Sequence, residues 1–204
     1  MKYNILIPSL LFTLSFFAQK GNTPYTQKEW LERAQKSIAA SNRLNTLASY
    51  YYAYTEDSGT PEGKNALRKS DSIKQVMQDK IMSELQGQWK LTSSGSNWGY
   101  TNADDQIQNI LVITGKDAVF SEVNLNNGES KILREEKLVF VQPSSSNYGY
   151  YHVMDFLYSD NKVWNFHVNE KNILHIIYVG DFLSGNINEM VCGSIEYHYI
   201  KMDY

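Results

Sequence analysis

A chain of 204 residues with a formal net charge of −3 is long enough for one sizeable domain, or for a small domain with an appendage. It lacks the basic excess typical of proteins that bind nucleic acids or anionic membrane surfaces, so neither is expected as a partner. The single cysteine, Cys192, excludes an intrachain disulfide, and a hydrophobic core must therefore provide the stability.

The N-terminus is predicted to be a signal peptide covering residues 1–19. Lys2 provides a short positive start, and residues 5–17 form an apolar run, which is shorter than the about 20 residues needed to span a bilayer. Ala18 provides a small residue for cleavage, and the alternative interpretation is a buried first helix. We expect an exported protein of the Gram-negative bacterial type, periplasmic or secreted, with no membrane span once the signal is removed.

Residues 20–86 are predicted to form an N-terminal helical hairpin. Thr26 and Glu29 make a capping box at the start of the first helix. The stretch "EDSGTPEGK" interrupts the helical pattern, and Pro61 suits the first position of a second helix. Gly87 then ends that helix in a left-handed conformation.

Residues 87–204 change from helical to alternating spacing of apolar residues, which predicts a β-domain. Turn sequences such as Asn127-Gly128 separate short strand-like runs, with no helical pattern between them. The predicted fold is therefore mainly β, an eight-stranded antiparallel up-and-down barrel preceded by the helical hairpin, with a sandwich as the other solution. The strands are expected at 88–94, 108–114, 117–125, 131–142, 152–159, 163–169, 173–180 and 194–202.

The hairpin around residues 170–172 defines an inward-facing wall. If Asn172 is left-handed, residue 168 faces 174, residue 166 faces 176 and residue 164 faces 178. One face then carries Val168, Phe166, Trp164, Leu174, Ile176 and Tyr178. The opposite face, with Ile173, Ile177 and Val179, is too apolar for open solvent, and we expect the helical hairpin to cover it.

The stretch "LQGQWKL", with Gly87-Gln88-Trp89 at the change from helix to strand, resembles the lipocalin-like superfamily, and the ending "CGSIEYHYIKM" is similar to last strands of small exported bacterial members. The resemblance covers residues 85–202. It implies that Trp89 packs across the closed end of a barrel beneath a basic side chain, for which Lys201 is the late candidate. It also implies that the long segment 94–109 acts as a lid over the open end.

The resemblance further implies a non-enzymatic binding protein that holds a small apolar or aromatic ligand inside the barrel, without a cofactor. The candidate ligand-binding residues are Trp98 in the lid and Phe156, Tyr158, Trp164, Phe166, Ile176 and Tyr178 on the wall. The alternative is an interaction protein whose barrel is filled by side chains. Such a protein would bind a protein partner through Tyr-rich surfaces at residues 50–54 and 142–152.

The sequence contains no H-E-x-x-H, G-x-S-x-G or Gly-rich phosphate motif, so no catalytic residues are predicted. The hairpin register places His167 opposite His175, close enough to share a metal. Because no third ligand is placed by the sequence, we predict no metal site. Glu196 and His198 share a strand face and are interpreted as a surface patch, and Cys192 as a small buried residue.

Overall fold

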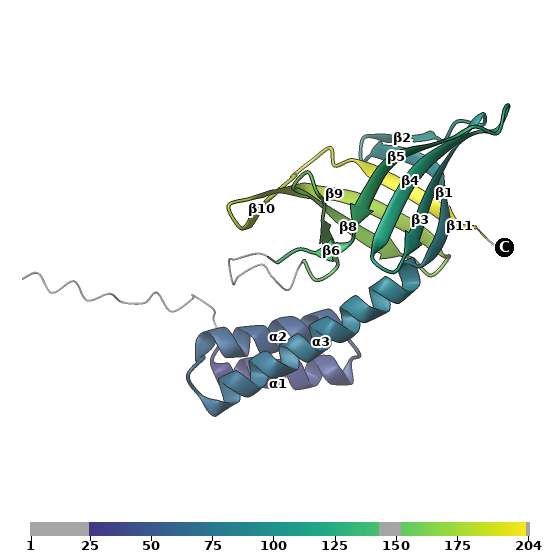
Figure 1. Cartoon of the computed structure of the whole chain (residues 1–204). Helices are drawn as coiled ribbons and strands as arrows, with labels where there is room; N and C mark the ends of the chain where they lie inside the picture. The colour runs from purple at the N-terminus through teal and green to yellow at the C-terminus, as the bar shows by residue number, and fades with distance from the viewer. Residues whose placement is uncertain (1–24, 143–151, 203–204) are drawn as a thin grey trace, which may run out of the picture.

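The computed structural model of this protein describes residues 25–142 and 152–202, so the predicted signal peptide lies outside the described residues. The described chain is mainly β, with three helices followed by one large antiparallel sheet (Figure 1). No helix in this part of the chain is long and apolar enough to cross a membrane.

The helical part contains three helices rather than the expected two: α1 (Gln27–Ala39), α2 (Arg43–Glu56) and α3 (Pro61–Leu85). The additional break lies at Ser41, whose φ of 56° cannot continue a helix. Asn42 then caps α2 by accepting a hydrogen bond from the backbone N–H of Asn45. The capping box of Thr26 with Glu29 is confirmed, as is the position of Pro61 in the first turn of α3.

Helix α3 joins the helical part to one end of the sheet, because only Gln86 separates it from the first strand (Figure 1). Ile81 and Leu85 belong to the same hydrophobic core as Trp89. The amide of Gln78 donates to the backbone carbonyl of Val153 at 3.4 Å. The helices therefore pack at this end, and the prediction that they cover the outer face carrying Ile173, Ile177 and Val179 is wrong.

Within the described residues the sheet contains eleven strands, and each of the eight expected runs overlaps at least one of them. Strands β2 and β10 form additional short hairpins, and the predicted run 131–142 is divided into β5 and β6. Their bounds are β1 Gly87–Ser96, β2 Gly99–Asn102, β3 Ile107–Thr114, β4 Asp117–Asn124, β5 Ser130–Lys137, β6 Val139–Phe140, β7 Asp155–Leu157, β8 Lys162–Val168, β9 Ile173–Leu183, β10 Asn186–Glu189 and β11 Glu196–Lys201.

The strand ladder is open, so the expected closed eight-stranded barrel is not observed. Its order is β5-β4-β3-β1-β11-β9-β8-β7-β6, with β2 paired to β1 and β10 paired to β9. The two edge strands, β5 and β6, are separated in sequence only by the buried Leu138. One continuous segment of chain thus forms both edges: its β5 part pairs with β4, and its β6 part pairs with β7. The two edges of the sheet therefore meet at Leu138, although β5 and β6 do not pair with each other.

The register of the β8–β9 hairpin is confirmed. Asn172 has a φ of 56°, and Val168, Phe166 and Trp164 pair with Leu174, Ile176 and Tyr178. These side chains are buried or partly buried and form one wall of the main core. At one end of this core the fully buried Trp89 donates its indole N–H to the carbonyl of Leu85 at 2.8 Å.

Candidate functional site

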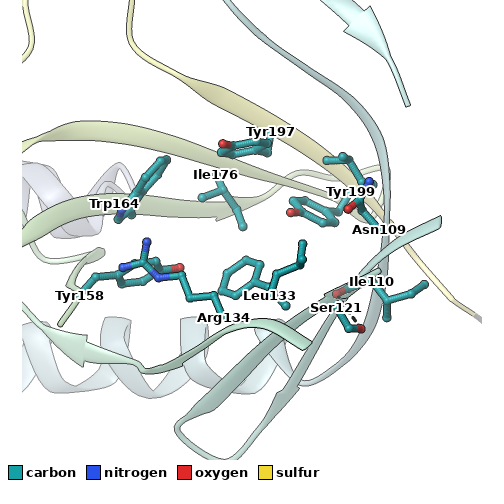
Figure 2. A pocket seen from close by; sticks show the side chains of 12 residues that line it. Asn109, Ile110, Ser121, Leu133, Arg134, Tyr158, Trp164, Ile176, Tyr197 and Tyr199 are labelled. Atoms are coloured by element: carbon teal, nitrogen blue, oxygen red, sulfur yellow. Dashed lines mark hydrogen bonds between the residues drawn. The ribbon is translucent and has the colours of Figure 1, made fainter. Parts of the chain in front are cut away.

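A cavity of about 490 Å³ lies between the walls of the sheet (Figure 2). Strands β1, β3, β4, β5, β8, β9 and β11 and the turn after β7 contribute to it. Its lining residues are Leu91, Asn109, Ile110, Phe120, Ser121, Leu133, Arg134, Tyr158, Trp164, Ile176, Tyr197 and Tyr199. The cavity is thus lined mostly by aromatic and aliphatic side chains, with a small number of polar groups, as is typical of small-molecule sites.

Aromatic rings gather at the end of the cavity formed by β8 and the segment after β7. The ring of Trp164 lies 5.9 Å from that of Tyr158 and 5.9 Å from that of Tyr197, between centroids. The ring of Phe120 meets Tyr158 edge-on at 6.3 Å. Aromatic pairs prefer such offset and edge-on arrangements, and these contacts hold each ring in place.

Two buried polar atoms of the cavity lining have no partner within the described part of the chain, the hydroxyl of Tyr158 and the indole N–H of Trp164. The two side chains are only 5% and 7% exposed, so bulk solvent does not satisfy these groups. Buried polar groups are almost always hydrogen-bonded, and an exception calls for a ligand, a water molecule or a strained state. Burial also raises the pKa of Tyr158 well above its ordinary value, which keeps the hydroxyl protonated and able to donate.

Among the described residues of the lining, Arg134 is the one with a charged side chain, and its charge is already neutralised. Its guanidinium lies 4.7 Å over the ring of Tyr158 and forms ion pairs with Glu136 at 2.5 Å and Asp160 at 3.1 Å. Glu136 also accepts hydrogen bonds from the backbone N–H and the hydroxyl of Ser159, at 2.9 and 2.8 Å. Burial would raise the pKa of Asp160, but the hydrogen bond and charge of Arg134 outweigh it and lower that pKa.

The structure brings three of the seven predicted ligand-binding residues to this cavity: Tyr158, Trp164 and Ile176. Phe156 and Phe166 are fully buried in the packed core, where their rings meet edge-on at 5.2 Å. Tyr178 packs beside Trp164 at 5.3 Å and donates its hydroxyl to Asp181 at 2.8 Å.

Trp98 lies at the tip of the β1–β2 hairpin, is 78% exposed and is not part of the lining. The segment expected as a lid, 94–109, instead forms that hairpin, which pairs along β1. Only its last residue, Asn109, reaches the cavity.

Sequence reasoning missed the contributions of β5 and β11 to the cavity. Arg134 and Leu133 are consecutive in β5, because a register shift in the β4–β5 ladder near Phe120 interrupts the alternation there. Tyr197 and Tyr199 follow simple alternation on β11 and face inward opposite Ile176 and Leu174. The alternation in "EYHYIK" could have predicted that Tyr197 and Tyr199 face inward. No pattern in the sequence predicts that Leu133 and Arg134 both reach the cavity.

A polar cluster lies on the outer face of the sheet. His175 and His198 are register partners on β9 and β11, with rings stacked at 4.3 Å and 13°. Glu196 lies 2.9 Å from Nε2 of His175 and accepts a hydrogen bond from the hydroxyl of Tyr100 at 2.5 Å. That hydrogen bond and the one to His175 lower the pKa of Glu196, against burial, whereas burial and the charge of His175 lower the pKa of His198.

The predicted pairing of His167 with His175 across β8 and β9 is confirmed, but the ring of His175 stacks on His198. A second His–acid pair lies inside: the buried His152 contacts Asp155 at 2.6 Å, and Asn165 donates to the other oxygen of Asp155 at 2.6 Å. This pair holds the segment that leads into β7.

The other predicted surfaces differ from expectation. Tyr50 is buried, and Tyr52 stacks on Trp30 at 4.7 Å, so much of the 50–54 cluster stabilises the helical part. The loop 142–152 lies outside the described residues except at its two ends. Cys192 is exposed, and its prediction as a buried residue is wrong because it lies in an irregular segment after β10.

The chain was compared with models of known protein families, with curated proteins and with solved structures, and none of them matches it.

Proposed function

We propose that this protein binds a small, uncharged, apolar or aromatic molecule in the cavity between β5, β8, β9 and β11, and catalyses no reaction. The volume of about 490 Å³ falls in the range of small-molecule sites, roughly 300–1,000 Å³. Aromatic rings form much of the lining, and they gain most from contact with a flat apolar ligand.

The observation that carries this proposal is the pair of unpartnered polar groups on Tyr158 and Trp164 within the described chain. An indole N–H only donates, and a phenol hydroxyl donates or accepts. A ligand with one or two acceptor atoms would satisfy both groups and recover the free energy that their burial costs. The proposed ligand therefore carries a carbonyl, ether or ring-nitrogen acceptor on an otherwise apolar body.

The charges around Arg134 argue for an uncharged ligand. The two carboxylates of Glu136 and Asp160 already pair with this guanidinium. An anion placed here would compete with them, and a buried charge without a partner of its own is costly.

A lipocalin-like assignment is part of the same proposal, and it rests on local contacts because the strand ladder is open. Three features support it: the buried Trp89 at one end of the core, the ammonium group of Lys201 over its ring, and the inward-facing aromatic wall. We also propose export of the mature chain, on the pattern of residues 1–19.

A second function, binding of a protein partner, is favoured by exposed apolar side chains. Trp98, Met190, Val191 and Ile195 are each about half exposed or more, up to 95% for Val191. A Cβ on Gly193 would lie 3.2 Å from the indole nitrogen of Trp98, so the hairpin tip and the loop after β10 are in contact. Contiguous exposed apolar groups of this kind often mark interaction sites.

Titration with a fluorescent apolar probe tests the cavity proposal directly. Leu133 is 47% exposed and reaches toward Tyr199 in the cavity, whereas the neighbouring Ile132 is 58% exposed and does not line it (Figure 2). Leu133→Trp should occlude the cavity and weaken probe binding by about tenfold or more, the effect of losing roughly 1.4 kcal/mol of contact. Ile132→Trp is the matched control and should leave binding unchanged; equal binding by both variants would contradict the proposal.

A further inference from the structure

Two histidines and a glutamate converge on the outer face of the sheet, separate from the cavity. His175 and His198 are directly opposite each other on adjacent strands. Glu196 lies two residues before His198 on the same strand, so its side chain leaves the sheet on the same face. The alternation places Tyr197 and Tyr199 on the inner face, so this cluster and the cavity lie on opposite sides of β11.

The ligand atoms of these three side chains lie within 4.8 Å of one another. Nε2 of His175 and Oε2 of Glu196 are 2.9 Å apart, close to the roughly 3.3 Å between two ligands on a tetrahedral zinc ion. The side chains of His175 and Glu196 are 26% and 13% exposed, so an ion could reach them from solvent. Small rotations of the side chains would bring all three donors to one centre.

We propose that His175, Glu196 and His198 form a binding site for a divalent transition-metal ion of the zinc class. Two imidazole nitrogens and one carboxylate are a common set of protein ligands for Zn²⁺, and they leave a fourth position for water. The same donors suit Cu²⁺, Ni²⁺ and Co²⁺ but not Ca²⁺ or Mg²⁺, which prefer oxygen ligands alone. The rigid pairing of β9 with β11 keeps the donors close before an ion binds.

Two further residues orient these ligands. The hydroxyl of Tyr100, on β2, bonds to the same Glu196 oxygen that contacts His175. The hydroxyl of Ser93, on β1, lies 3.3 Å from Nδ1 of His198. Outer partners of this kind fix the direction of metal ligands and usually change metal affinity by about 10- to 100-fold when removed.

The cluster differs from an ordinary surface patch in its geometry. The two imidazole rings stack at 4.3 Å, and a carboxylate oxygen of Glu196 lies 2.9 Å from Nε2 of His175. A single divalent ion would satisfy both nitrogens and the carboxylate at once. His167 lies on the same face, opposite His175 and exposed, yet is not part of the convergent group.

Isothermal titration calorimetry with Zn²⁺, on protein that carries no histidine tag, tests this proposal. The expected result is one Zn²⁺ per chain, with uptake lost or weakened at least about tenfold in His175→Gln, Glu196→Gln and His198→Gln, and weakened in Tyr100→Phe. His167→Gln is the matched control and should bind as the parent does. Bound Co²⁺ should show the intense visible absorption of a four-coordinate site.

Circular dichroism of each variant would establish that it is folded before its affinity is compared. The proposal is overturned if the parent chain takes up no stoichiometric Zn²⁺ at micromolar concentrations. It is also overturned if His167→Gln removes binding as fully as His175→Gln, since that would assign the ion to the His167–His175 pair. Neither outcome depends on whether the cavity binds a ligand.

Discussion

The ammonium group of Lys201 lies 5.1 Å from the centre of the Trp89 ring, and the two residues are direct register partners on β11 and β1. Trp89 is fully buried below it and bonds to the end of α3 through Leu85. Glycine suits position 87 for two reasons. Its φ of 122° is one that other residues rarely adopt, and a Cβ there would lie only 3.2 Å from Cε of Lys201. These contacts join helix, first strand and last strand at one end of the sheet.

Replacing Trp89 should therefore be far more damaging than replacing Lys201. Trp89→Ala is expected to lower the free energy of unfolding by about 3–5 kcal/mol through a core cavity. Lys201→Met should cost about 1 kcal/mol or less, since a largely exposed cation on a ring contributes only that much. Urea denaturation of both variants measures this, and comparable losses would contradict the assignment of Trp89 as the plug.

The side chains between β5 and the β7–β8 turn should stabilise the open edges of the sheet. Glu136 is buried and serves both Arg134 and Ser159, so Glu136→Ala should cost about 3 kcal/mol, as expected for breaking a buried ion pair. Asp160→Asn is the control: its side chain is 36% exposed, and its loss should cost under about 1 kcal/mol. If urea denaturation gave equal losses in the free energy of unfolding for the two variants, the stabilising role assigned to the buried Glu136 would be contradicted.

Two buried tyrosines beside Trp164 offer a matched pair of variants. Tyr178→Phe removes a hydrogen bond to Asp181 and should destabilise the protein by about 1 kcal/mol. Tyr158→Phe removes a hydroxyl that has no partner in the described chain, so it should leave stability unchanged or raise it. If the cavity binds a ligand through that hydroxyl, the same variant should weaken ligand binding; thermal melts and ligand titrations together separate the two effects.

Stability should fall at alkaline pH. Burial raises the pKa of Tyr178 to about 12, helped by its hydrogen bond to Asp181, and burial also raises the pKa of Tyr158 and Tyr199. In the unfolded chain these tyrosine hydroxyls ionise near pH 10, whereas in the folded chain they stay protonated to higher pH. Their contribution to the free energy of unfolding is therefore complete below about pH 10 and is lost as the pH rises toward 12.

Urea denaturation at a series of pH values, followed together with tyrosinate absorbance, checks this. Tyr178→Phe should show a shallower loss of stability above pH 10 than the parent does. A flat stability profile up to pH 12 would contradict the burial of these three hydroxyls.

The strands were predictable from alternation and turn residues, as the β8–β9 register with its left-handed Asn172 shows. The break at Ser41 was not, because it interrupts a helical pattern by a single left-handed residue without Gly or Pro. Nor was the division of β5 from β6, since Leu138 continues the apolar pattern while the chain exchanges one strand partner for another.

For the candidate site, the sequence predicted the aromatic wall but not its limits. Tyr158 and Trp164 line the cavity, whereas Phe156 and Phe166, with the same alternation, are buried beyond it. Alternation predicts on which face of the sheet a side chain lies. It does not predict whether that side chain lines the cavity or is buried in the packed core. The pairing of His175 with His198 depends on β9 and β11 being neighbours, which is a long-range contact that spacing along the chain does not reveal.

Native mass spectrometry of the protein purified from its natural source tests the central claim, a ligand in the cavity, most directly. We expect a stoichiometric small molecule that is uncharged, largely apolar and equipped with a hydrogen-bond acceptor, and that is absent from Leu133→Trp but present in Ile132→Trp. A clean mass for the chain alone, together with no uptake of apolar probes, would contradict the account and direct attention to the exposed apolar surface around Trp98 and Val191.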